Sequence, residues 1–332
     1  MDPVTHLAVG ALGGQALRKP LRRDKHVLVF CLLAAWLPDI DNFIGILGPE
    51  FYLIHHRGLT HSFLGAILLA ALFVWIFRWF VPSFSFIRGF VLVYLLIALH
   101  IFLDLITSYG TQIFFPFTNA RYAVTSVFII DPIYTLVMLF CMYRSAKYLK
   151  TRKTLALLGL AWVFIYPAFN LGVRYGLEYY LEQRFVREGV AFNAFDVSTD
   201  VLSPFFWKVI VDQGDAYQLG GVNVFKLRQP LTFTRYEKAD NNLFREFGQI
   251  SSLFATYHWF FDFPIMRTEQ IEKETLITFG DLRFATAAPF LQHQRNNDQL
   301  PFTLTMVLDE QQKPVRYQYQ RRGREQVVLL IE

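Results

Sequence analysis

The chain of 332 residues contains very little cysteine and little charge. Its two cysteines, Cys31 and Cys141, both fall inside apolar stretches, so we expect neither a disulfide framework nor a cysteine metal site. Charged residues make up only 18% of the sequence and hydrophobic residues 54%, a balance that is unusual for a soluble enzyme. No basic patch interleaved with exposed aromatics is evident, so a nucleic-acid partner is not expected.

The hydrophobic residues are concentrated in the first half of the chain. Runs of about 18 or more mainly apolar residues are long enough to cross a bilayer as helices. Such runs occupy residues 27–46, 63–81, 89–107, 124–143 and 154–173. A shorter run, residues 3–17, contains three glycines and either spans beside other helices or lies at the interface. The sequence therefore predicts a polytopic α-helical bundle of five or six spanning helices over residues 1–174.

The sequence becomes that of an ordinary mixed domain after Arg174. We expect a helical extension over residues 175–187 and an embedded helix over residues 241–261. Strands are expected at residues 205–211, 231–236, 276–285, 302–308, 315–319 and 327–331. This spacing leaves little room for crossover helices, so residues 175–332 are predicted to form an extramembrane α+β domain with an antiparallel sheet. Its expected role is to cover the site, select substrate, bind a partner or stabilise the bundle.

Lysine and arginine collect in three short loops, within residues 18–25, 78–88 and 144–153. Positively charged loops remain on the cytoplasmic side of a membrane protein. The other loops, residues 47–62 and 108–123, then lie outside together with the C-terminal domain. We expect an integral protein of the bacterial inner membrane, with its C-terminal domain on the outer, periplasmic face. No secretory signal is evident, so the chain is expected to stay uncut in the membrane.

Histidines and carboxylates gather at the outer ends of these helices. An ionised side chain in lipid costs about 2.5 to 3.5 kcal/mol on insertion scales, so such residues usually have a function. His100 and Asp104 are four residues apart and project from the same helix face. Imidazole and carboxylate are common zinc ligands, and without a cation several carboxylates in one pocket would repel one another. The predicted metal ligands are His6, Asp39, Asp41, His61, His100 and Asp104.

Neighbouring residues complete the predicted site. Whichever of Asp39 and Asp41 does not bind the metal would act as a base or orient a ligating histidine. Adjacent residues rarely face the same ion, so of His55 and His56 we favour His56 as a residue of the site, with a role in catalysis. Arg57 and Arg121 both suit phosphate oxygens, and either one could instead serve as an interfacial anchor or salt-bridge partner. Asp131, which precedes a proline, either accepts a hydrogen bond from a ligating imidazole or caps its helix.

Several of these residues form motifs that resemble a known family. The motifs are Leu37-Pro38-Asp39-Ile40-Asp41, His56-Arg57-Gly58-Leu59-Thr60-His61-Ser62, His100-x-x-x-Asp104 followed by Thr107-Ser108-Tyr109-Gly110-Thr111, and Arg121-Tyr122. Over roughly residues 1–131 the chain resembles the membrane-bound metal-dependent hydrolases of the YdjM-like group. The resemblance implies hydrolysis with a bound metal. Arg121 and Tyr122 are placed with Arg57 among the substrate-binding residues.

A more remote likeness, in the logic of the motifs, is to zinc-dependent phospholipase C and the S1/P1 nucleases. It implies one ion held by Asp41 or Asp39 together with His61, His100 and Asp104, and a second ion held by His6 and bridged by Asp104. Two features of those enzymes differ here. They use a further helical His-x-x-x-Glu, which this chain lacks, and a metal-bound N-terminal amine, which Met1-Asp2 does not obviously supply.

The sequence thus predicts a membrane-embedded metal-dependent hydrolase that uses metal-activated water on a phosphoester. The expected cofactor is zinc, one to three ions, with manganese as the other option. A site just below the headgroup level favours an amphiphilic or lipid-linked phosphate taken from the bilayer. The alternative is a non-catalytic metal-binding protein with a structural, carrier or scaffold role. A peptidase is disfavoured because the chain lacks His-Glu-x-x-His.

Overall fold

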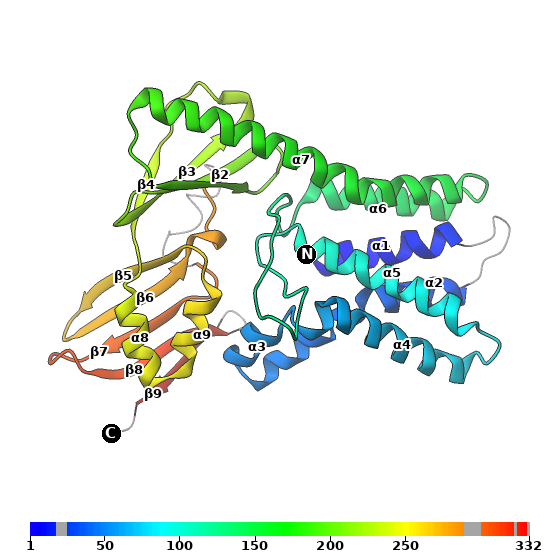
Figure 1. Cartoon of the computed structure of the whole chain (residues 1–332), viewed down its shortest axis with the longest axis horizontal. Coiled ribbons are helices and arrows are strands. Elements are labelled where there is room, and N and C mark those ends of the chain that lie inside the picture. Colours follow the sequence, from blue (N-terminus) through cyan, green and yellow to red (C-terminus); the bar gives the residue numbers. More distant parts are fainter. Residues whose placement is uncertain (18–24, 289–299, 322–323, 331–332) are drawn as a thin grey trace. The chain divides into compact units, whose positions relative to one another are not determined.

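The computed structural model describes residues 1–17, 25–288, 300–321 and 324–330 (Figure 1). Most of the first basic loop, residues 18–24, and the end of the last predicted strand lie outside the described residues. The chain forms two compact units, Met1–Ile46 with His55–Arg174 and Leu47–Ile54 with Tyr175–Glu332. The first unit ends at Arg174 and the second continues from Tyr175, and residues 47–54 cluster with the second unit.

The first unit is built mainly from helices. Its elements are α1 (Pro3–Leu17), α2 (Lys25–Trp36), the 3₁₀ segments η1 (Leu37–Leu47) and η2 (Leu59–His61), α4 (Phe63–Phe80), α5 (Phe86–Leu105), α6 (Pro132–Lys147) and the first part of α7 (Arg152–Glu188). Within the described residues, four helical stretches are long and apolar enough to cross a membrane: His26–Leu47, Phe63–Phe80, Phe86–Leu105 and Arg152–Glu188. They overlap four of the predicted spans, and the expected number of five or six is not confirmed.

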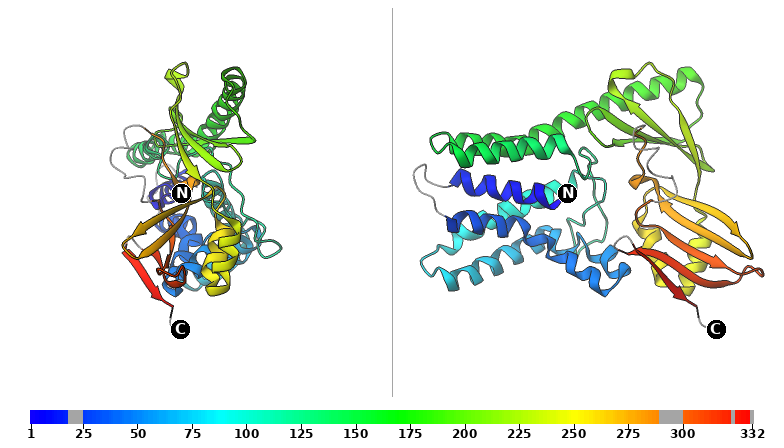
Figure 2. Two further views of the ribbon diagram at one scale, coloured as in Figure 1. Left: turned by 90° about the vertical axis from the view of Figure 1, so that its left-hand side faces the viewer. Right: turned by 180° about the vertical axis from the view of Figure 1, so that it is seen from behind.

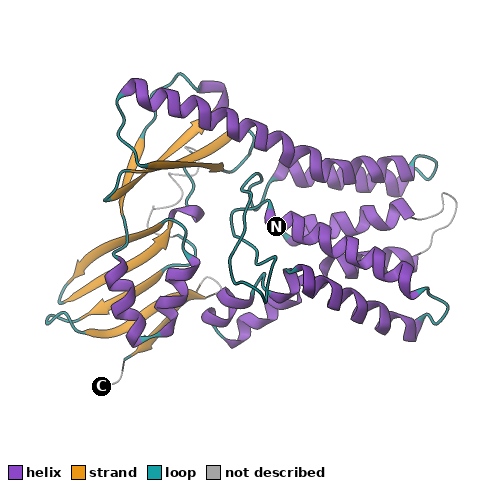
Figure 3. Ribbon diagram, in the orientation of Figure 1, coloured by secondary structure: helices purple, strands orange, loops and turns teal. Residues whose placement is uncertain are grey.

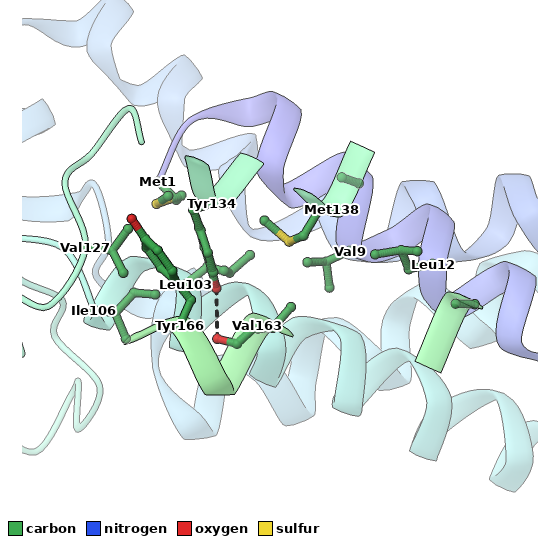
Figure 4. Packing of buried hydrophobic residues seen from close by; sticks show 12 residues of the cluster. Met1, Val9, Leu12, Leu103, Ile106, Val127, Tyr134, Met138, Val163 and Tyr166 are labelled. Carbon is green, nitrogen blue, oxygen red and sulfur yellow. Dashed lines mark hydrogen bonds between the residues drawn. The ribbon is translucent and has the colours of Figure 1, made fainter. Parts of the chain in front are cut away.

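Helix α1 packs inside the bundle. Its residues from Thr5 to Gln15 are buried, with the exception of Leu7. Gly10 permits close approach to α2, because a Cβ at this position would lie 2.7 Å from Ala35 Cβ. Leu12 belongs to a core that α5, α6 and α7 share with α1 (Figure 4). This packing favours a helix beside other helices over the interfacial alternative for residues 3–17.

Helix α6 begins eight residues later than the predicted span of residues 124–143. Asp131 caps it, because its Oδ1 accepts a hydrogen bond from the backbone N–H of Tyr134 at 3.0 Å. Its Oδ2 accepts one from the Tyr166 hydroxyl at 2.8 Å. A residue before proline is driven out of the helical conformation, which explains why the helix cannot extend backwards past Pro132. Of the two roles considered for Asp131, the structure therefore shows the cap.

The second unit contains two antiparallel sheets with their strands in sequential order (Figure 2). One sheet holds β1 (Ala194–Thr199), β2 (Phe206–Asp212), β3 (Ala216–Asn223) and β4 (Phe233–Glu237), and the other holds β5 (Pro264–Ile271), β6 (Glu274–Asp281), β7 (Leu304–Leu308), β8 (Pro314–Arg321) and β9 (Arg324–Leu329). Short 3₁₀ segments follow β3 and β6, at η3 (Val224–Lys226) and η4 (Leu282–Phe284). The prediction of a single sheet missed β1, β3 and β5.

Helices α8 (Asn241–Ile250) and α9 (Ser252–Phe260) cover one face of the five-stranded sheet (Figure 3). Phe244 and Phe254 pack against Phe279 of β6, with ring centroids 4.3 and 6.1 Å away. We expected one helix over residues 241–261. It is divided at Ser251, whose side chain accepts a hydrogen bond from the Leu253 N–H and so caps α9. The short helix α3 (Pro49–His55) lies almost entirely within this unit.

Candidate metal centre

Four segments of the first unit bring histidines and aspartates together: α1, η1, the loop before α4, and the last turns of α5. The residues that could hold a metal ion form two groups, His6 with Asp39 and His100, and His61 with His100 and Asp104. In each group the possible ligand atoms lie within 4.8 Å of one another. All five residues are buried, with exposures between 0 and 9%. His100 and Asp104, four residues apart on α5, thus lie close to side chains that are distant in the sequence.

The group around Asp104 has the chemistry of a cation site. His61 Nε2 lies 3.1 Å from His100 Nε2, and both nitrogens lie near Asp104 Oδ2, at 3.1 and 3.3 Å. His100 Nδ1 lies 2.7 Å from the Ala35 carbonyl oxygen and must donate its proton there. A neutral His100 then points the lone pair of Nε2 at a carboxylate oxygen. Two acceptors at that distance require a proton or a metal ion between them.

The second group provides an independent test of the fit. Both ring nitrogens of His6 are buried and make no hydrogen bond, although His6 Nε2 approaches Asp104 Oδ1 at 3.5 Å. The His6 ring stacks on His100 at 3.7 Å. Asp39 Oδ1 lies 3.8 Å from His100 Nε2. Buried polar atoms normally have partners, so an imidazole left without one fits the role of a metal ligand.

Asp41 takes a different position from Asp39. Its Oδ1 lies 2.8 Å from His56 Nδ1. Its Oδ2 accepts hydrogen bonds from the Arg57 backbone N–H at 2.9 Å and the Thr60 hydroxyl at 2.7 Å, and lies 3.1 Å from His61 Nδ1. Asp41 belongs to neither metal group among the described residues. The structure therefore places Asp41 where a residue orients two histidines, and Asp39 where a residue could bind metal.

Arg57 binds Asp104 instead of facing an open site. Its Nη2 lies 2.8 Å from Asp104 Oδ1, and Nη1 donates to the Thr107 hydroxyl at 3.1 Å. The guanidinium also lies 4.7 Å from the ring centroid of Tyr109. This is the salt-bridge role that the sequence left open. The α-amino group of Met1 contacts the same oxygen of Asp104, a contact that the sequence did not make evident.

Arg121 and Tyr122 lie in the irregular segment between α5 and α6. Arg121 donates to the Tyr109 carbonyl oxygen, and its guanidinium lies 5.6 Å from the Tyr109 ring centroid. Tyr122 forms a two-way backbone bridge with Thr111, at 2.9 and 3.0 Å. Tyr109 thus contacts both Arg57 and Arg121. The only signal for this role in the sequence was the position of Tyr109 in the Thr-Ser-Tyr-Gly-Thr motif.

The electrostatics of the loop reflect the carboxylates that lie beside its histidines. Burial lowers the pKa of His61, but Asp104 and Asp41 outweigh this effect and raise the pKa to about 9. Burial also lowers the pKa of His56, although the contact with Asp41 opposes this. The two carboxylates therefore favour the protonated form of His61 when no metal ion is bound. A metal ion bound there would displace this proton, since ligating imidazoles must be neutral.

These features define a polytopic membrane protein with a buried histidine–aspartate centre that could bind a metal ion. Residues 1–177 match the family described as YdjM inner membrane protein, and the chain belongs to this family. The relative named "Uncharacterized protein YfhP", from Bacillus subtilis (strain 168), is 30% identical over 138 residues. These residues cover 40% of this chain and 42% of the relative, so the chain spans less than half of the length of that relative.

No solved structure matches the chain. The predicted resemblance to the YdjM family is confirmed. The remote likeness to phospholipase C and the S1/P1 nucleases receives no support from these comparisons.

Proposed function

We propose that this protein is a membrane-embedded metal-dependent hydrolase that cleaves a phosphoester. The observation that carries the proposal is the buried convergence of His61 Nε2, His100 Nε2 and Asp104 Oδ2, at 3.1 to 3.3 Å from one another. These residues would hold one divalent ion, zinc or manganese. His6 and Asp39, with His100 shared, would hold a second. A divalent ion in such a site supplies Lewis acidity and activates water.

The side chains around the centre supply positioning and proton transfer. The contact of 2.8 Å between His56 Nδ1 and Asp41 Oδ1 forms a histidine–carboxylate pair suited to general acid–base catalysis. Because Asp41 accepts the Nδ1 proton, Nε2 is the atom of His56 that takes or gives a proton. Asp41 orients His61 in the same way, and Arg57 holds Asp104 in place. These roles explain why one aspartate and one arginine lie behind the ligands.

The substrate we propose is an amphiphilic or lipid-linked phosphate. The segment of residues 106–131, in the same unit as the centre, exposes Phe114, Phe117 and Ile130. Aromatic and aliphatic side chains exposed beside the ends of spanning helices suit the membrane interface. Arg121 and Tyr122 lie in this segment and would contact a phosphate headgroup. The distribution of basic loops supports a site on the outer face of the inner membrane.

A non-catalytic metal-binding protein is the second candidate. The observation that favours it is the burial of all five candidate ligands, none of which is more than 9% exposed. Structural metal sites have closed coordination shells, whereas catalytic sites keep one position for water or substrate. Turnover therefore separates the two functions.

The test is elemental analysis of the purified full-length protein beside His100→Ala and Asp104→Ala. Hydrolysis of phospholipids in mixed micelles and of p-nitrophenyl phosphate esters is assayed on the same samples. His258→Ala is the control, because His258 lies in the second unit and bonds Asn241. Zinc or manganese that is lost together with activity in both site variants, and retained in the control, supports the hydrolase. Metal-free protein from a metal-replete preparation refutes the centre, and bound metal without turnover supports the second candidate.

A further inference from the structure

Within the second unit, the end of α7 packs against the four-stranded sheet (Figure 1). Phe185 contacts Phe195 of β1, with ring centroids 5.5 Å apart. The buried residues of α7 here form a helical stripe, with Leu177, Leu181 and Phe185 exposed by 4, 0 and 0%. Arg184 lies in the same stripe and is only 6% exposed. A charged side chain is costly in apolar surroundings unless partners replace the lost water, so Arg184 needs an explanation.

The contacts of Arg184 use only part of its guanidinium. Nε donates to Glu188 Oε1 at 2.7 Å, and Nη1 donates to the Leu227 carbonyl oxygen at 2.8 Å. The side chain of Glu188 is 50% exposed, so this ion pair contributes little. Among the residues that the structure describes, Nη2 donates to no acceptor. Because a guanidinium carries five N–H donors, Arg184 can still bind a further acceptor.

A cavity of about 200 Å³ lies beside this guanidinium. Its lining comes from α7, β2, β3, the segment after η3 and residues 287–288, all of the second unit. Leu181, Trp207 and Val222 give it apolar surface and are no more than 3% exposed. Lys226 and Thr232 line it as well and are exposed, so the cavity opens to the surface of this unit.

The walls of the cavity are held by contacts within the protein. The Tyr180 hydroxyl donates to the Leu227 carbonyl oxygen at 3.1 Å, beside the hydrogen bond from Arg184. On another side, a Cβ at Gly221 would clash with the carbonyl oxygen of Ala287, so glycine permits this close approach to β3. The cavity is therefore largely preformed, as ligand sites usually are.

The lining favours a ligand of particular charge and size. Arg184 and Lys226 line the cavity, and no carboxylate does so in the described part of the chain. A guanidinium matches two oxygens of a phosphate, and an ammonium adds a second positive charge. A cavity of ~150 Å³ holds one benzene ring. The volume here thus suits a phosphate attached to a single ring or a short chain.

We propose that this cavity, which we call the α7 cavity, binds a phosphate monoester. The phosphate would contact Arg184 and Lys226, and the organic part next to it would pack against Trp207. The inference adds a second site to the molecule and does not depend on the metal centre, since its residues all belong to the second unit. A phosphate monoester can be a soluble compound or the headgroup of a lipid, and competition distinguishes these two sources.

The first test is titration calorimetry of the full-length protein in detergent micelles. The probe is phenylphosphonate, whose C–P bond resists hydrolysis, and a chelator removes any metal from the metal centre. We expect a Kd of about 1 mM or tighter. Arg184→Gln should raise the Kd about tenfold or more, because it removes the charged donors. Lys226→Gln should raise it about threefold, since an exposed charge contributes less.

Two further variants complete this test. Arg187→Gln is the control, because Arg187 is exposed on α7 and does not line the cavity. Thr232→Trp places a large ring at an exposed lining position and should remove measurable binding. If hydrogen–deuterium exchange shows that Arg184→Gln unfolds β2 and β3, the variants at Lys226 and Thr232 decide. A wild type that binds no phenylphosphonate, or equal Kd values in all variants, would overturn the inference and leave the metal centre untouched.

The second test is displacement of phenylphosphonate by two competitors that carry the same phosphate. One is glycerol 3-phosphate, and the other is dihexanoyl phosphatidate. Displacement by glycerol 3-phosphate supports the site with a soluble ligand. Displacement by the phosphatidate alone supports it with a lipid headgroup. If neither competes, the assignment to a phosphate monoester is overturned.

Discussion

Replacement of Asp41 by asparagine tests whether this carboxylate orients the candidate ligands instead of binding metal. Asp41 contacts four donors at 2.7 to 3.1 Å, one through Oδ1 and three through Oδ2. Asparagine keeps the shape but replaces one acceptor oxygen with an NH₂ donor. The amide oxygen can satisfy Arg57, Thr60 and His61, which leaves NH₂ facing His56 Nδ1. His56 must then change its tautomer, and His61 loses the negative charge that holds it.

We expect Asp41→Asn to weaken metal binding without abolishing it. Removal of a partner that orients a ligating histidine weakens metal binding about 10- to 100-fold, which is ~1.4 to 2.8 kcal/mol. His100→Ala should have a larger effect, because His100 belongs to both groups of candidate ligands. The Asp41→Asn protein should therefore still bind metal stoichiometrically at high concentration, with weaker affinity.

The assay is zinc competition against a chelator of known affinity, on purified protein in detergent. Asp215→Asn provides the control, because Asp215 is an exposed aspartate that pairs with Arg235 in the second unit. Wild-type affinity in Asp41→Asn would show that Asp41 does not orient the histidines. Metal loss as complete as in His100→Ala would show that Asp41 is itself a ligand. Either result would refute the division of roles between Asp39 and Asp41.

Three further predictions concern the stability of the first unit. Removal of bound metal with a chelator should lower the thermal unfolding temperature, since a ligand at 100 times its Kd stabilises the fold by about 2.7 kcal/mol. Added zinc should restore the unfolding temperature. An unchanged temperature after chelation would argue against a bound metal. Tyr166→Phe removes the hydroxyl that donates to Asp131 and should destabilise the fold by ~1 to 2 kcal/mol in denaturant unfolding. The metal content should stay the same. Unchanged stability would show that this hydrogen bond contributes nothing. Gly10→Ala should destabilise it by ~1 to 3 kcal/mol, because the new Cβ lies 2.7 Å from that of Ala35, and it should weaken metal binding because the Ala35 carbonyl orients a candidate ligand. Gly172→Ala is its control, with no atom within 4 Å of the added Cβ, and equal stability of the two variants would contradict the packing argument.

The sequence was informative wherever a property depends on neighbouring residues. Four apolar runs predicted helices that are long enough to span, because bilayer thickness sets the required length. The spacing of His100 and Asp104 predicted that they share one face of a helix, because residues four apart lie on the same side of an α-helix. The predicted helix over residues 124–143 started too early because hydropathy outweighed the Asp131-Pro132 boundary signal. Strands β1, β3 and β5 were missed because strand propensity depends on tertiary context.

By itself, the sequence determined a half with apolar runs long enough to span a membrane, a half of mixed helices and strands, and a set of histidines and aspartates suited to metal. Only the tertiary structure decided how that set is divided. It brings Asp39 towards His100 and sets Asp41 behind the histidine loop. It pairs Arg57 with Asp104 across 47 residues, and Glu50 with Ser252 across 202. The periods of helices and the length of a span are local properties of the chain, whereas these contacts depend on how distant segments pack, which no spacing in the sequence encodes.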